Sequence, residues 1–200
     1  MRIVQDRWYD TLEASGGHVS IDDVEIGPVA TRSDATGRAQ ELFLDDRNVH
    51  GCAETAFVVL KETFGLPDPG DSAAAMALNG GLAYSGGTCG AVTGAALAVG
   101  MLAGRRISDH RAAKRVARLV TADLLGAFEA EFGTSACREL IGMDLRTEAG
   151  HQAFIDSGIW RDRCMRQIEM AVARLAPLRD ETVWDATADA LEAGPTPPSR

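Results

Sequence analysis

The sequence predicts an all-α protein: a compact helical bundle built around a buried Gly/Ala-rich helix, with a short extended N-terminal arm. From Ser33 onward, apolar residues recur at helical rather than alternating spacing. The segment between Asp71 and Arg105 carries no formal charge, and its longest apolar part, 89–103, is rich in Ala and Gly. Such a segment is too poor in large side chains to favour lipid, so it is expected to pack closely inside the bundle.

The N-terminal elements are short. Residues 1–14 space their apolar side chains as one amphipathic helix does. Residues 18–26 alternate apolar and polar side chains, which predicts a short strand or extended arm that ends at Pro28. Residues 1–33 are therefore expected to form an N-terminal extension.

Helices follow in order, each bounded by a capping or breaking residue. Ser33 or Asp34 is a candidate N-cap for the first of them. Later helices are expected at about 50–64, 72–78, 88–103, 108–132, 135–142, 147–157, 159–176 and 180–192. This order predicts a four-cysteine helical domain over 34–177, followed by a C-terminal helix and a frayed tail over 178–200.

Composition limits the possible partners. The chain has 20 Lys and Arg against 29 Asp and Glu, a net charge of −9. Nucleic acids and anionic membranes need a basic surface, so both are excluded as expected partners. The charged N-terminus does not fit a secretory signal, and a cytoplasmic protein is expected. Reducing conditions there favour free or metal-bound thiols over structural disulfides.

The four cysteines are the main candidates for chemistry. Cys52, Cys89, Cys137 and Cys164 stand far apart in the sequence, so no CxxC pair occurs. The first three fall in or near the first turn of an expected helix, where the helix dipole should lower the pKa of a thiol. Cys164 is expected inside a helix. A thiolate is the form that binds metal or attacks a disulfide.

The surroundings of these cysteines resemble a known family. The motifs are Cys89-Gly90-Ala91-Val92-Thr93-Gly94, Gly-Cys-Ala at 51–53, Cys137-Arg138 and Cys164. Together they resemble the C-GCAxxG-C-C family of redox-active proteins over residues 36 to 168. That family is similar to the C-terminal part of split-Soret cytochromes c, in which cysteines hold a [2Fe–2S] cluster. The resemblance implies that Cys52, Cys89, Cys137 and Cys164 are cluster ligands. No CxxCH motif is present, so the haem half of those cytochromes is missing.

Physical chemistry narrows what a joint cysteine site requires. Four thiolates without a cation repel one another, so the site needs metal, protons or disulfides. A cluster with four cysteines remains anionic and needs backbone N–H donors, which Gly51, Gly87 and Gly90 are suited to supply. Zinc would accept the same four ligands.

Two polar residues are further candidates beside Cys52. His50 is expected either to polarise the Cys52 thiolate or to be a solvated residue at a helix start. Glu54 is a candidate proton donor two residues past Cys52. Together with Cys89 and Cys52, His50 and Glu54 are the candidate catalytic residues.

Three functions remain open from the sequence. The first is an iron–sulfur protein that transfers electrons with a redox partner or serves as the redox or Lewis-acid centre for a small-molecule substrate. The second is a thiol–disulfide oxidoreductase in which Cys89 attacks and Cys52 resolves. The third is a helical interaction module that is zinc-stabilised or metal-free. The uncharged Ala/Gly face also predicts a homodimer.

Overall fold

The computed structural model describes residues 29–47 and 49–193, with side chains from Arg32 onward. The expected helix over 1–14, the arm over 18–26 and the tail over 194–200 lie outside the described residues. Within the described part, the chain is helical and forms no strand, which confirms the predicted class. The helices are α2 (Val29–Phe43), α3 (Cys52–Phe64), α4 (Gly90–Arg106), α5 (His110–Phe132), α6 (Cys137–Ile141), α7 (Glu148–Ser157), α8 (Arg163–Leu175) and α9 (Glu181–Ala193). Short 3₁₀ segments are η2 (Ala73–Leu78), η3 (Ile159–Arg161) and η4 (Ala176–Arg179).

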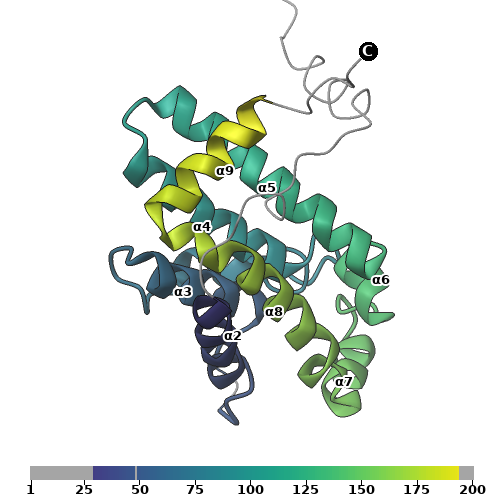
Figure 1. The fold of residues 1–200 in the computed structure, drawn as a ribbon. Helices are drawn as coiled ribbons and strands as arrows, with labels where there is room; N and C mark the ends of the chain where they lie inside the picture. Colours follow the sequence, from purple (N-terminus) through teal and green to yellow (C-terminus); the bar gives the residue numbers. More distant parts are fainter. Residues whose placement is uncertain (1–28, 48, 194–200) are drawn as a thin grey trace, which may run out of the picture.

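The Gly/Ala-rich helix α4 lies at the centre of the bundle, as expected. It packs against α3 on one side and α5 on another (Figure 1), and α8 contacts all three helices. Gly94 allows the closest approach, because a Cβ built there would overlap the carbonyl oxygen of Ala53 and lie 2.8 Å from its carbonyl carbon. Small residues in α4 therefore let its backbone touch the start of α3.

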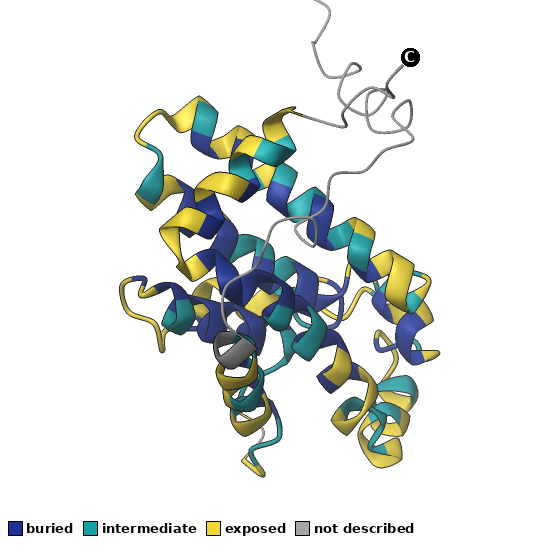
Figure 2. Cartoon of the chain, viewed as in Figure 1, coloured by how far each residue is buried: buried dark blue, intermediate teal, exposed yellow. Residues whose placement is uncertain are grey.

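The C-terminal helices close the core. α8 packs against α2, α3, α4 and α5, and α9 packs against α5. Figure 2 shows the buried residues gathered where α3, α4 and α8 meet. Ile168 and Leu175 of α8 are fully buried, and Trp184 of α9 is 2% exposed. No helix in the described residues is long and apolar enough to cross a membrane.

Several helix boundaries differ from the sequence prediction. α2 begins at Val29, ahead of both residues proposed as its N-cap. α5 is capped by Asp109, whose side chain accepts a hydrogen bond of 2.8 Å from Ala112 N. The helix predicted over 159–176 is interrupted, since η3 ends at Arg161 and α8 begins only at Arg163. This interruption matters for the cysteines.

Candidate metal centre

All four cysteines lie where a helix begins. Cys52 is the first residue of α3, and Cys89 is the N-cap of α4. Cys137 is the first residue of α6, and Cys164 is the second residue of α8. The prediction that Cys164 lies inside a helix was wrong, because the break between η3 and α8 places it in a first turn. The positive dipole ends of the longer helices α3, α4 and α8 thus lie at the region of the thiols.

A backbone bridge joins the segments of Cys89 and Cys137. Thr88 and Ala136 form an isolated antiparallel bridge. The Cys89 N–H donates to Ser135 O at 2.7 Å, and the Cys137 N–H donates to Gly87 O at 2.7 Å. Two cysteines that are distant in the sequence are therefore held side by side by main-chain hydrogen bonds.

Gln167 brings the fourth cysteine's helix to the same place. The Cys89 thiol donates to Gln167 Oε1 at 3.5 Å, and Gln167 is 4% exposed. Gln167 lies one turn after Cys164 on α8, so the two side chains share a face of that helix. Arg163 adds a bond to Leu140 O at 3.3 Å, which ties the start of α8 to α6. Gln167 was not expected from the sequence, because its contact with Cys89 joins two distant segments of the chain.

Gly90 makes room for the Cys52 sulfur. A Cβ at Gly90 would overlap Cys52 Sγ and would lie 3.0 Å from Ala53 N. The first residue of α4, next to Cys89, is thus in direct contact with Cys52 and Ala53 at the start of α3. Cys52 is half-buried, whereas the other three cysteines are buried.

Glu54 has a structural position rather than that of a free proton donor. It is 7% exposed. Its Oε2 accepts from Gly51 N at 3.0 Å and from Asn79 Nδ2 at 2.8 Å, while its Oε1 accepts from Ser72 Oγ at 2.9 Å. With three hydrogen bonds, the carboxylate caps the start of α3 and holds η2 beside it. The structure therefore gives no support to the proton-donor hypothesis for Glu54.

The backbone donors around the thiols differ from the expected set. The Gly51 N–H is bonded to Glu54, and the Gly87 N–H donates to Gly81 O at 3.1 Å, so both are already used within the fold. Gly90 matches the expectation better, since its backbone acts to lower the pKa of Cys52. The backbone of Gly80 and of Ala53 acts in the same direction, and neither residue was expected from the sequence.

Burial dominates the electrostatics of the metal-free thiols. Desolvation raises the pKa of Cys52, and the nearby backbone groups only partly oppose this rise. Burial, followed by the charge of Cys52, raises the pKa of Cys89 well above its ordinary value, and Cys137 and Cys164 add to the rise. Burial is also the main cause that raises the pKa of Cys164. The expectation of lowered thiol pKa values at helix starts was wrong, because the loss of hydration outweighs the helix dipole.

These shifts predict a pH dependence for the metal-free protein. Burial raises the pKa of Cys137 from 9.0 to about 12. A raised folded-state pKa contributes stability that is complete below the unfolded pKa and is lost as the pH rises towards the folded one. Metal-free protein should therefore lose stability between pH 9.0 and about 12. Urea unfolding across this range should show a smaller loss for Cys137→Ala, and an equal loss in both proteins would contradict the assignment.

His50 lies just before α3 and is half-buried. Within the described residues, no hydrogen bond joins it to Cys52. Its role at the thiol stays a prediction from the sequence.

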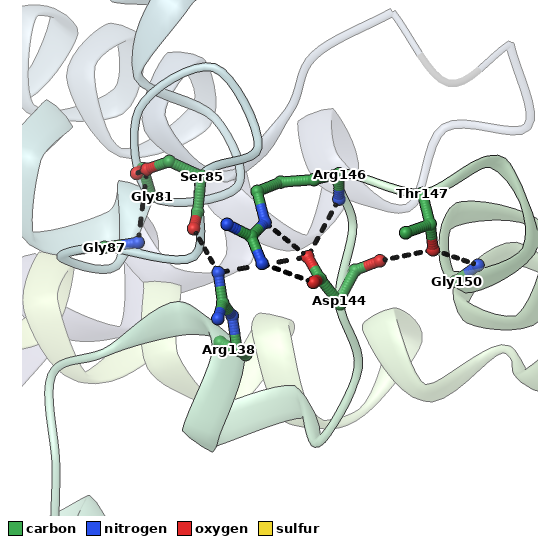
Figure 3. A network of polar contacts seen from close by, with 8 residues as sticks. All are labelled: Gly81, Ser85, Gly87, Arg138, Asp144, Arg146, Thr147 and Gly150. Carbon is green, nitrogen blue, oxygen red and sulfur yellow. Dashed lines mark hydrogen bonds and ion pairs between the residues drawn. The ribbon is translucent and has the colours of Figure 1, made fainter.

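Arg138, next to Cys137, ties the loop over 79–87 to the segment before α7. Its guanidinium donates to Ser85 O at 2.9 Å and lies 3.9 Å from Asp144 Oδ1. Asp144 in turn pairs with Arg146 at 2.6 Å (Figure 3). The network fixes the loop against α6 beside the cysteines.

The donor set suits a thiophilic metal centre. Four thiols from four elements lie within electrostatic reach of one another, since Cys52, Cys137 and Cys164 each affect the pKa of Cys89. In the described part of the chain, no three His, Cys, Asp or Glu side chains stand at the spacing that a metal ion requires. Loading a metal centre would therefore need side-chain adjustment to draw the sulfurs together. Each thiol would also have to release its proton.

The fold and this site define an all-helical protein with four cysteines gathered at helix starts. Residues 50–178 match the family model described as "Putative redox-active protein (C_GCAxxG_C_C)", and the chain belongs to that family. The match spans all four cysteines. Neither the curated proteins nor the solved structures gave a match to this chain.

Proposed function

We propose that the protein is an iron–sulfur protein of the [2Fe–2S] type, with Cys52, Cys89, Cys137 and Cys164 as ligands. It acts in electron transfer with a redox partner, or as the redox or Lewis-acid centre of a small-molecule reaction. The observation that carries the proposal is the convergence of four thiols, from four separate helix starts, on one buried region. When bound, such a cluster supplies a one-electron redox couple.

The residues around the thiols suit an anionic centre. Backbone groups of Gly80, Ala53 and Gly90 act to lower the pKa of Cys52. Backbone groups that lower a thiol pKa stabilise the negatively charged sulfur that a cluster needs. The uncharged segment over 72–104 supplies both the loop and α4, so no acidic side chain from it opposes the charge.

The metal-free structure does not favour the thiol-exchange alternative. An attacking Cys89 would have to be a thiolate, yet burial holds its pKa well above the ordinary value. Cys89 is also buried, which restricts the access of a disulfide substrate. Zinc remains compatible with four thiol ligands, so the test must separate the two metals.

Metal analysis of four single variants tests the proposal. Protein purified without oxygen is expected to contain about two irons and two sulfides per chain, with absorption above roughly 400 nm. Each of Cys52→Ala, Cys89→Ala, Cys137→Ala and Cys164→Ala should lose the iron and the colour together. Thr93→Val, at a half-buried position on the same helix as Gly90, is the control and should keep both.

Three outcomes would contradict the proposal. One is a colourless protein with about one zinc per chain, which would indicate a single tetrahedral site. Another is full iron and colour in any one of the four alanine variants, which would remove that cysteine from the ligand set. The third is protein that stays free of iron after reconstitution.

A further inference from the structure

The loop between η2 and α4 has an unusual backbone. Gly80, Gly81, Leu82, Ala83 and Tyr84 all have positive φ, and three of these five are not glycine. Non-glycine residues avoid this left-handed region, and a run of them persists only where the surrounding structure enforces it. Hydrogen bonds across the loop do so here, including Ala83 N to Ala77 O at 2.7 Å and Gly86 N to Gly80 O at 3.0 Å.

This left-handed turn begins directly after Asn79 and brings that residue to the first turn of α3. Asn79 Oδ1 accepts from Ala53 N at 2.9 Å, and Nδ2 donates to Glu54 Oε2 at 2.8 Å. Nδ2 also lies 3.2 Å from Met76 O. The two ends of the amide are therefore distinguished by their partners, which fixes its orientation.

The same amide reaches the Cys52 thiol. Cys52 Sγ lies 3.9 Å from Asn79 Oδ1, at the long end of a sulfur hydrogen bond. The Asn79 side chain therefore contacts the sulfur from the side of the loop.

Gly51 leaves room for the Asn79 side chain because it has no side chain of its own. A Cβ at Gly51 would lie 2.6 Å from Asn79 Nδ2 and would overlap the other atoms of the amide. The residue before Cys52 therefore leaves space that the Asn79 side chain fills. Glycine at position 51 has no side chain that could cap α3. The Asn79 side chain, from a later segment of the chain, caps the helix instead by accepting a hydrogen bond from Ala53 N.

We infer that Asn79 is a positioning residue for Cys52: its side chain fixes the first turn of α3, and with it the direction of the Cys52 sulfur. The inference rests on the proposed function only in taking Cys52 as a ligand. Ser72 provides a contrast within the same network, because its hydroxyl bonds the other oxygen of Glu54 without approaching Cys52. A purely structural role would make Asn79 and Ser72 equivalent.

Alkylation of the metal-free, full-length protein tests the positioning role. Native protein is treated with iodoacetamide at neutral pH, and each cysteine is followed by peptide mass spectrometry. Asn79→Ala and Gly51→Ala should each raise the labelling rate of Cys52 roughly tenfold, because its first turn opens locally. Ser72→Ala should leave that rate near the wild-type value. The labelling rates of the buried Cys137 and Cys164 should be the same in all three variants.

A second readout applies to the reconstituted protein. Asn79→Ala should shift the visible absorption bands and the reduction potential, while Ser72→Ala should leave both unchanged. If Asn79→Ala does not fold, Asn79→Ser replaces it in both measurements. Equal effects of the Asn79 and Ser72 variants on Cys52 labelling would overturn the inference. The labelling result stands even if wild-type protein takes up no iron, so failure of the cluster proposal is distinguishable from failure of this one.

Discussion

Asp123→Leu is expected to destabilise the protein by about 3–5 kcal/mol. Asp123 Oδ2 accepts from Arg174 Nη2 at 2.8 Å and from Arg174 Nε at 3.1 Å, so one carboxylate oxygen binds both nitrogens of the fork. The side chains are 0% and 7% exposed respectively. Removing the carboxylate takes this counter-charge away from a buried guanidinium, and breaking a buried ion pair by removing one partner is strongly unfavourable.

Urea unfolding of the single and double variants checks this expectation. The double variant Asp123→Leu with Arg174→Met removes both charges and keeps a similar apolar volume, so it should recover most of the lost stability. Arg115→Ala is the surface control, because its ion pair with Glu192 is exposed and such pairs contribute little. A single variant as stable as wild type would show that the buried pair does not hold α5 to α8.

Gly94→Ala is expected to destabilise the fold by about 1–3 kcal/mol or more. The new methyl group would overlap the carbonyl oxygen of Ala53 and lie 3.0 Å from its Cα, all of it backbone that rotamer changes cannot move. α3 and α4 would have to separate at the point where they carry Cys52 and Cys89.

Gly100→Ala is the matched control on the same helix. Gly100 is exposed, and a Cβ there would meet nothing within 4 Å. The same substitution should therefore stabilise α4 by roughly 0.5–1 kcal/mol through its helix propensity. Thermal or urea unfolding of the two variants should give shifts of opposite sign. A stabilised Gly94→Ala would refute the close contact between α3 and α4.

The sequence predicted the helical class and the central Gly/Ala helix because both depend on local composition and periodicity. The expected close packing of the Gly/Ala-rich segment also agrees with the structure, where Gly90 and Gly94 contact the start of α3. The position of Cys164 was missed because it depends on the break at Asp162, which separates η3 from α8. Periodicity alone cannot separate such a break from a continuous helix.

The sequence indicated which cysteines form the candidate site, but it did not indicate which other residues contact them. The four cysteines were found from their motifs. The roles of Asn79 and Gln167 depend on long-range contacts that no local pattern encodes. The thiol pKa values went the opposite way from the prediction because a helix start is visible in the sequence, whereas the depth of burial is a property of the whole fold.

The bridge between Thr88 and Ala136 also bears on the order in which the molecule forms. It joins segments that flank the whole of α4 and α5, so it closes a long loop whose entropy must be overcome before the contact forms. Cys164 comes later still in the chain. A growing polypeptide that ends before α8 has three of the four thiols and lacks the Gln167 contact to Cys89. During synthesis the complete thiol set is therefore available only once α8 has been made, after the segments that form α3 and α4.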